Sequence, residues 1–261
     1  MLRALHIAST GMDAQQRKMD VTSNNLANVN TTAFKRGRAE FQDLLYQTVK
    51  APGTATGQGT NSPSGIQIGL GVRHVSTSRD FTQGTMNNTG NALDIAIEGD
   101  GFFQVTQPNG EVAFTRAGNF TSDNQGRVVN PDGLPLEPQV VVPPDTLSVT
   151  IAGDGIVSVL QAGQTQATEL GQIQLARFIN PGGMRALGRN LFQQTNASGQ
   201  AVVGNPGGTG IGTLAQGFLE GGNVNVVEEM VSLIVGQRSY EANSKIISAS
   251  DEMLRSAVQL R

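Results

Sequence analysis

The sequence predicts an α+β protein in which N- and C-terminal helices pair as a coiled-coil-like stalk around a β-rich, barrel-like or sandwich-like central domain. Apolar residues near both ends recur at alternating steps of three and four, which is the spacing of a coiled-coil seam. The middle holds short apolar segments separated by many of the 33 glycines, which favours short strands and tight turns. We therefore expect a helical part at 1–45 with 223–261, an extended arm at 46–70 and a β-rich domain at 71–222.

The first helix is expected from about Leu2 to Leu26, and the segment after it is rich in Asn and Thr, which compete for helical hydrogen bonds. The second helix is expected to begin at an Asn223 or Asn225 cap, with acidic residues in its first turns. Both apolar stripes contain small and polar residues, so each helix needs a packing partner. Periodicity alone also fits two helices packed on one globular core, but their places at the two ends favour the stalk.

Residues 36–50 fit either a short helix or an extended arm. The stretch 51–65 (APGTATGQGTNSPSG) has almost no apolar residues to bury, so we expect a linker or exposed loop with few core contacts. Because it cannot contribute much to a core, its removal should leave the folding of the rest intact.

Strand patterns extend from about Gly69 to Gly222. Residues 93–98 alternate apolar and polar side chains, 99–101 (GDG) supply a turn, and 102–105 resume, which predicts a hairpin. Further hairpins are predicted at 120–129 and 147–159, and an alternating strand at 172–178. Such closely spaced strands are typical of an antiparallel barrel or sandwich.

The totals exclude several classes of protein. The chain has 261 residues, no Cys and a net charge of -3, so disulfides and thiolate sites are absent and a nucleic-acid partner is not expected. No apolar stretch is long enough to span a bilayer, and the N-terminus lacks the pattern of a secretory signal. If the protein leaves the cytoplasm, we expect export without a cleaved leader.

The sequence gives no support for an enzyme. The two histidines, His6 and His74, are far apart, and no cluster of acidic residues accompanies them, so we expect no catalytic residue, metal or cofactor. A β-rich carbohydrate-binding module remains an alternative, although such sites usually stack sugars on aromatic rings and the chain has no Trp.

Three segments resemble the signatures of the flagellar rod and hook protein family. Residues 24–35 are similar to NNLANxxTxxFK, although Ala33 stands where many relatives carry Gly. Residues 93–103 resemble LDxAIxGxGFF, and residues 223–254 resemble the SNVxxxxEM…QRxYExNSKxI…DEML terminus of the family. The insertion at 51–65, followed by residues 64–73, is similar to the distal rod members as against the hook members. The resemblance covers essentially the whole chain.

The resemblance implies a structural subunit of the bacterial distal rod, a helical tube that spans periplasm to outer membrane and transmits torque from motor to hook. The implied partners are further copies of the chain, proximal rod proteins, hook or hook-cap-side proteins, the surrounding P- and L-ring proteins and the flagellar type III export apparatus; no small-molecule substrate is implied. In the family, the insertion is thought to make the rod straight and stiff. A hook or proximal rod subunit of the same family is the alternative.

We assign two sets of residues on these grounds. A fold role without a ligand is expected for Leu93, Asp94, Ile97, Gly99, Gly101, Phe102 and Phe103. Subunit assembly is expected to involve Leu2, Leu5, Met12, Met19, Asn24, Asn25, Leu26, Asn28, Phe34, Met230, Leu233, Gln237, Tyr240, Ile247, Leu254 and Val258.

Overall fold

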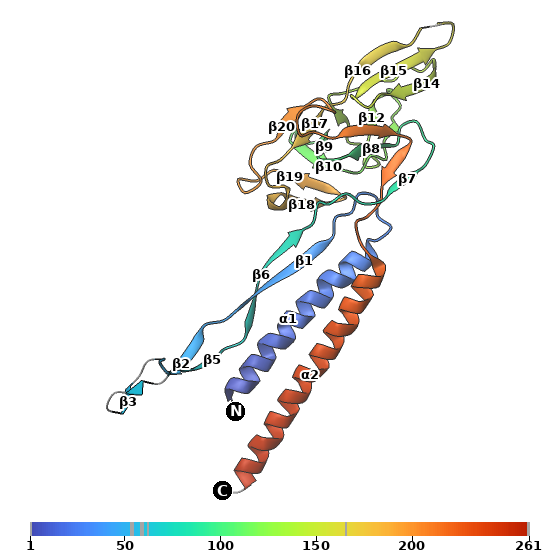
Figure 1. Ribbon diagram of the computed structural model, residues 1–261. Helices are drawn as coiled ribbons and strands as arrows, with labels where there is room; N and C mark the ends of the chain where they lie inside the picture. Colours follow the sequence, from blue (N-terminus) through green and yellow to red (C-terminus); the bar gives the residue numbers. More distant parts are fainter. Residues whose placement is uncertain (1, 53–54, 58–59, 62, 165, 260–261) are drawn as a thin grey trace. The chain divides into compact units, whose positions relative to one another are not determined.

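The computed structural model describes residues 2–52, 55–57, 60–61, 63–164 and 166–259. The chain divides into two compact units (Figure 1). Unit 1 comprises Met1–Ala27, Gly37–Arg79 and Asn225–Arg261, and unit 2 comprises Asn28–Arg36 and Asp80–Val224. Long helices at both ends and strands between them confirm the predicted α+β class. No helix in the described part of the chain is long and apolar enough to cross a membrane.

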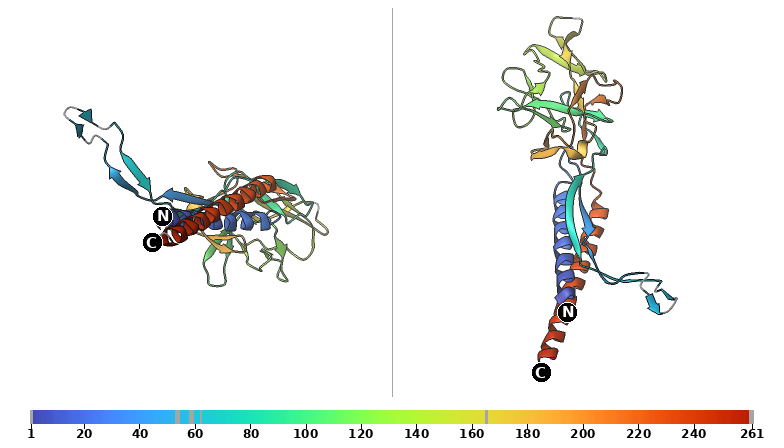
Figure 2. Two further views of the ribbon diagram at one scale, coloured as in Figure 1. Left: turned by 90° about the horizontal axis from the view of Figure 1, so that it is seen from below. Right: turned by 90° about the vertical axis from the view of Figure 1, so that its left-hand side faces the viewer.

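Two long helices, α1 (Leu2–Ala27) and α2 (Val226–Gln259), lie side by side in unit 1 (Figures 1 and 2). Small residues allow the close approach. A Cβ atom at Gly11 would lie 3.0 Å from Asn243 Nδ2, and one at Gly236 would lie 3.1 Å from Met19 Cγ. Because an early residue of α1 meets a late residue of α2, the two helices run antiparallel.

The N-terminus of α2 is capped by Asn225. Its side-chain Oδ1 accepts a hydrogen bond from the backbone N–H of Val227 (3.1 Å), and its carbonyl accepts one from Glu229. This satisfies backbone donors that a helix start leaves free. Of the two predicted caps, Asn223 is therefore the wrong one; its side chain bonds elsewhere, as described below.

An antiparallel ribbon accompanies α1 in unit 1. It consists of β1 (Gly37–Asp43) paired with β6 (Val72–Arg79), and it continues as β2 (Tyr46–Lys50) paired with β5 (Ile66–Gly69). Residues 36–50 thus form the extended arm, not the short helix. The predicted loop at 51–65 is partly ordered as a small hairpin of β3 (Ala55–Gly57) and β4 (Thr60–Asn61), while 53–54, 58–59 and 62 lie outside the described residues.

Unit 2 is built almost entirely of antiparallel strands. A seven-stranded sheet has the order β18-β19-β10-β9-β17-β20, with β13 also paired to β9; β14, β15 and β16 form a second sheet, and β11–β12, β8–β21 and β7–β22 are pairs. The bounds are β7 (Met86–Asn88), β8 (Ile95–Glu98), β9 (Phe102–Thr106), β10 (Val112–Thr115), β11 (Thr121–Ser122), β12 (Val128–Val129), β13 (Leu136–Glu137), β14 (Thr146–Ile151), β15 (Ile156–Gln161), β16 (Thr168–Gln172), β17 (Leu175–Arg177), β18 (Arg185–Gly188), β19 (Leu191–Gln193), β20 (Val202–Gly204), β21 (Thr213–Gln216) and β22 (Phe218–Glu220), with a 3-10 turn η1 (Pro181–Gly183).

The core of unit 2 draws side chains from most of these sheets. One cluster combines Ile97 of β8, Phe103 of β9, Val157 of β15 and Leu214 of β21, and a second cluster packs Phe102 against Phe178, Phe192 and neighbouring apolar residues. Aromatic pairs in both clusters meet edge to face, which is a favourable ring geometry.

Several predicted strands behave differently from their pattern. The hairpins at 120–129 and 147–159 are confirmed as β11–β12 and β14–β15. The predicted hairpin of 93–98 with 102–105 is wrong, because β8 pairs with β21 whereas β9 pairs with β10, β13 and β17. Residues 95–97 are all buried, so both faces of β8 are covered and the expected alternation is absent. Within 172–178, only Leu175–Arg177 form β17, and Leu175 and Ala176 are both buried.

Candidate assembly surface and connector clamp

The seam between α1 and α2 consists of small and polar residues. In α2 the fully buried positions are Glu229, Gly236 and Ser250, which lie on a seven-residue repeat together with Asn243. In α1 the buried positions are Ala8, Ala14, Thr22 and Asn25, of which Asn25 bonds to the ribbon and not to α2. Met19 of α1 packs directly on Gly236 within the seam.

The predicted assembly residues are distributed over three environments. Exposed positions are held by Asn24, Met230, Gln237, Tyr240 and Val258, and buried ones by Asn25 and Phe34; the side chain of Leu2 lies outside the described part. Half-buried positions are held by Leu5, Met12, Met19, Leu26, Asn28, Leu233, Ile247 and Leu254. The structure therefore brings only part of the predicted set into the seam.

A second apolar face lies on the first turns of α2, and the sequence reasoning singled out only Met230 of it. We call it the outer stripe, and each of its side chains is between 51% and 69% exposed. Its positions follow the i, i+3, i+4, i+7, i+8 pattern of one helix face, which is centred on the side of α2 opposite Gly236. The members are Val227, Met230, Val231, Ile234 and Val235.

The end of α1 is joined to the ribbon by the side-chain amide of Asn25. Its Nδ2 donates to the Gly37 carbonyl (2.9 Å), and its Oδ1 accepts from the Gly37 N–H (2.8 Å). Such a reciprocal pair mimics one step of a β-ladder. Asn25 thus fixes where β1 starts along the helix.

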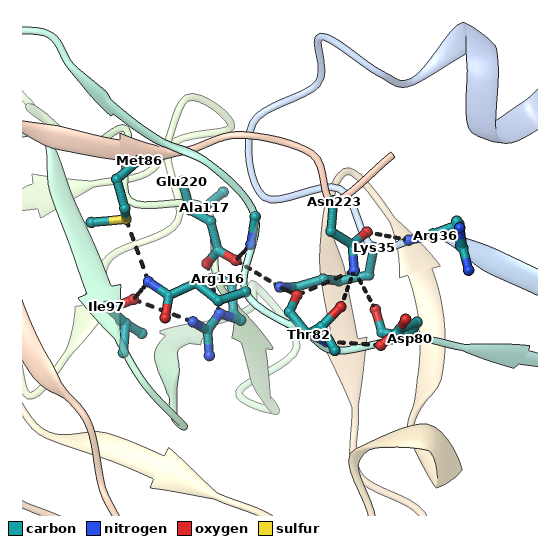
Figure 3. Close-up of polar contacts among 12 residues, drawn as sticks. Lys35, Arg36, Asp80, Thr82, Met86, Ile97, Arg116, Ala117, Glu220 and Asn223 are labelled. Atoms are coloured by element: carbon teal, nitrogen blue, oxygen red, sulfur yellow. Dashed lines mark hydrogen bonds and ion pairs between the residues drawn. The ribbon is translucent and has the colours of Figure 1, made fainter. Parts of the chain in front are cut away.

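Unit 2 contains a buried cluster of three charged side chains, Lys35, Arg116 and Glu220. Together with the nearby, half-buried amide of Asn223, we call it the connector clamp. Figure 3 shows the two cations converging on the Glu220 carboxylate. Lys35 Nζ donates to Oε1 (2.7 Å) and Arg116 Nε donates to Oε2 (2.8 Å), with all three side chains at most 3% exposed. The Gly84 N–H also donates to Oε1 (2.9 Å).

Backbone carbonyls accept further hydrogen bonds from both cations. Lys35 also donates to Thr82 O (2.7 Å), and the Arg116 guanidinium donates to the carbonyls of Ile97, Gly99 and Gly101. Buried charges are tolerated when they are paired and hydrogen-bonded, as both cations are here.

The clamp holds together three segments of unit 2 that precede or follow a passage of the chain between the two units. Asn223 Oδ1 accepts from the Arg36 N–H (2.7 Å), and its Nδ2 donates to the Asp80 carbonyl (2.9 Å). The Ala33 N–H donates to the Glu220 carbonyl (2.8 Å) from a left-handed backbone with φ 56°. The segments 33–36, 80–84 and 220–223 are therefore laced side by side by hydrogen bonds.

The two ends of the Lys35–Glu220 pair titrate abnormally. Burial lowers the pKa of Lys35 below its usual 10.5, and the nearby Glu220 only partly opposes this effect. Burial alone would raise the pKa of Glu220, but Arg116 and Lys35 outweigh it and hold the pKa below 4.5. The protein thus stabilises the charged form of Glu220, whereas burial disfavours the charged form of Lys35.

The residues with an expected fold role shape one turn of unit 2. Asp94 is buried and accepts hydrogen bonds from Thr89 Oγ1 (2.6 Å) and Asn91 Nδ2 (3.2 Å). Gly101 has φ 150°, and a Cβ there would lie 3.2 Å from Leu175, so this tight turn demands glycine. Its neighbours Ile97, Phe102 and Phe103 are buried, Gly99 is exposed, and Leu93 is half-buried.

Sequence reasoning missed Arg116 and Glu220. They lie 81 and 185 positions from Lys35, and nothing in their local pattern distinguishes them from solvated charges. Lys35 is the last residue of the segment 24–35 that resembles the family signature. Its place in that signature was the only feature of the sequence that pointed to a member of the clamp.

The chain is similar to known flagellar proteins over its whole length. Residues 5–35 match the family model described as flagella basal body rod protein, residues 96–159 the flagellar hook protein FlgE/F/G D1 domain, and residues 215–260 the flagellar basal body rod FlgEFG protein C-terminal. The chain is 49% identical over 260 residues to flagellar basal-body rod protein FlgG of Buchnera aphidicola, covering all of both chains.

Two relatives from one organism show which of two related flagellar protein families the chain resembles more. The chain is 47% identical to FlgG of Caulobacter vibrioides over 261 residues, covering all of both chains. It is 35% identical to FlgF of the same organism over 264 residues, covering 99% of this chain and 98% of the relative. The chain therefore belongs to the FlgG family of flagellar basal-body rod proteins.

Proposed function

We propose that the chain is a structural subunit of the bacterial flagellar distal rod, which polymerises into a helical tube and transmits torque from motor to hook. The role is mechanical and not enzymatic. One observation carries the proposal besides the family: α2 exposes the outer stripe over residues 227–235 although its other side is already paired with α1. An exposed apolar stripe of this extent is a surface for another protein.

The physical basis of assembly is heterologous contact. Burying the exposed half of each stripe residue contributes roughly 1 kcal/mol per side chain, which is small for one residue and substantial for all five. When a patch on one copy meets a different patch on the next, the contacts repeat without closing and produce a helical polymer. The seven-residue spacing of the α1–α2 seam supports a coiled-coil-like stalk as the unit that stacks.

The three parts of the chain have separate roles in this proposal. The helical part at 1–45 with 223–261 supplies the stacking surface, and the predicted assembly residues on α1 and α2 belong to it. The predicted β-rich part at 71–222 begins with β6 of unit 1 and belongs to unit 2 from Asp80 on. For unit 2 we propose a barrel-like or sandwich-like outer domain, an interpretation supported by the core shared among β8, β9, β15 and β21. The net charge of -3 suits a surface that turns inside a ring without strong attraction.

The arm at 46–70 provides a second contact surface. Leu45 is 86% exposed beside it, and Tyr46, Val49 and Ile66 are more than half exposed. A two-stranded ribbon is marginally stable in water unless something covers it. We infer that a neighbouring copy covers the arm and that this contact sets the straightness of the polymer.

The location and partners follow from the same proposal. The subunit acts in the flagellar basal body, spanning the periplasm to the outer membrane, after passage through the flagellar type III export apparatus. Its neighbours are proximal rod proteins below, hook or hook-cap-side proteins above, and the P- and L-ring proteins around it.

Electron microscopy of the purified protein at rising concentration tests the proposal. We expect straight hollow rods above a critical concentration. A chain that stays monomeric, or that forms only closed dimers at every concentration, would contradict it.

A further inference from the structure

A groove in unit 2 is not accounted for by assembly of the helices. It has a volume of about 440 Å³ and lies over the face formed by β9, β10 and β19. Its size falls within the range of ligand pockets. The lining residues are Gln104, Glu111, Val112, Phe114, Gln193 and Gln194.

The side-chain amide of Gln104 has an unusual environment. The residue is only 7% exposed, yet no group among the described residues hydrogen-bonds its amide. In the described part of the chain, no fully buried side-chain nitrogen or oxygen lacks a partner. The Gln104 amide must therefore open onto the groove and not onto the closed core. An amide that is this deeply placed and unpaired gains from a ligand that pairs with it.

The neighbouring groups define the chemistry of such a ligand. Glu111 Oε2 accepts hydrogen bonds from Asn109 Nδ2 and Gln193 Nε2, both at 3.1 Å, and so its carboxylate is held in place at the groove. No Lys, Arg or His lines the groove. A carboxylate without a cation favours a basic group and repels phosphates or acids.

The residues at the floor of the groove favour a peptide over a sugar as the ligand. Phe114 is only 3% exposed, so it offers no open ring face on which a sugar could stack. Val112 is 38% exposed and offers an apolar wall for an ordinary side chain. A glutamine amide has one acceptor and two donors, which match the C=O and N–H of a peptide group in a reciprocal pair.

We propose that this groove binds an extended peptide segment that carries a basic side chain, with Gln104 pairing its backbone and Glu111 its cation. The site lies in unit 2, so it does not depend on the outer stripe, and either proposal can fail without the other.

Nuclear magnetic resonance of the full chain at low concentration tests the site directly. The probes are acetyl-Gly-Lys-Gly-amide, acetyl-Gly-Glu-Gly-amide and N-acetylglucosamine, and the readout is the side-chain amide signal of Gln104. We expect a saturable shift with the lysine peptide and affinity about tenfold weaker for the other two probes. No saturable shift with the lysine peptide, or equal shifts with all three probes, would overturn the proposal.

Variants separate binding from folding. Gln104→Met should abolish the lysine-peptide shift at Gln193 without lowering the Tm, since no hydrogen bond is lost; the exposed Gln200→Met is its control and should change neither. A large fall in Tm for Gln104→Met would show that the amide is already paired inside the chain and would overturn the proposal. Glu111→Gln should remove the preference for lysine over glutamate.

Discussion

At the scale of single residues, Glu220 joins several parts of unit 2. Its carboxylate accepts hydrogen bonds from Lys35, Arg116 and Gly84, and its carbonyl accepts one from Ala33. Two cations share one carboxylate, so the clamp has a net positive charge, and burying that charge is unfavourable. We infer that the clamp serves to fix the segments 33–36, 80–84 and 220–223 in one arrangement, because a hydrophobic cluster would not require specific partners.

Replacing Glu220 by Gln should lower the free energy of unfolding by about 3–5 kcal/mol, because two buried cations then lack a counter-charge. Urea denaturation measures the change. Glu169→Gln, at an exposed position on β16, is the matched control and should be nearly neutral. Equal effects of the two substitutions would show that the clamp is not buried as described.

The stability advantage of the wild type over Glu220→Gln should depend on pH. The folded state lowers the pKa of Glu220, so its contribution is fully present above about pH 4.5 and is lost as the pH falls through the lower folded value. Denaturation curves from neutral to acid pH should therefore converge for the two proteins. Curves that diverge on acidification would contradict this sign.

At the scale of elements, the helix pair depends on the absence of side chains at Gly236 and Gly11. Gly236→Ala should be nearly neutral, because about 1 kcal/mol of helix propensity is offset by the 3.1 Å approach to Met19. Gly236→Leu should instead separate the helices and cost about 1–3 kcal/mol in unit 1. Circular dichroism during thermal unfolding measures both, with Ala242→Leu on the exposed side as control. A stable Gly236→Leu variant would contradict the close seam.

The arm should affect the polymer more than the monomer. Deleting residues 51–65 removes only the tip of the ribbon, in which the described strands pair solely with each other. We expect an unchanged Tm for the monomer and rods that assemble with a curve, as seen by electron microscopy. A collapse of the monomer Tm would show that the segment belongs to a core.

The helices and strands also differ in how well the sequence alone predicts them. The two helices, the hairpins at 120–129 and 147–159 and the fold class were predictable, because local periodicity and turn residues determine them. The burial of Ile95, Ala96 and Ile97 was not, because coverage of both faces of β8 depends on distant strands. The connector clamp was equally hidden, since Lys35, Arg116 and Glu220 meet only through the tertiary fold.

At the scale of the whole molecule, α2 has two surfaces of different character. The α1–α2 seam is narrow and built mainly of small and polar residues, and the two helices cover it within the chain. The outer stripe is broad and built of Val, Ile and Met, and nothing in the described chain covers it. Folding and assembly therefore use separate faces of α2, and a substitution on one face should leave the other process intact.

The most direct test is Ile234→Asp, compared with Ser244→Asp at an exposed position outside the stripe. Ile234 is 51% exposed, so a charge there remains hydrated in the monomer but is desolvated in a polymer that buries the stripe. Sedimentation at rising concentration, with the monomer Tm measured in parallel, gives both readouts. We predict that Ile234→Asp melts like the wild type yet forms no rods, whereas Ser244→Asp does both normally. Rods formed by Ile234→Asp at the wild-type concentration would contradict the outer stripe as the assembly surface.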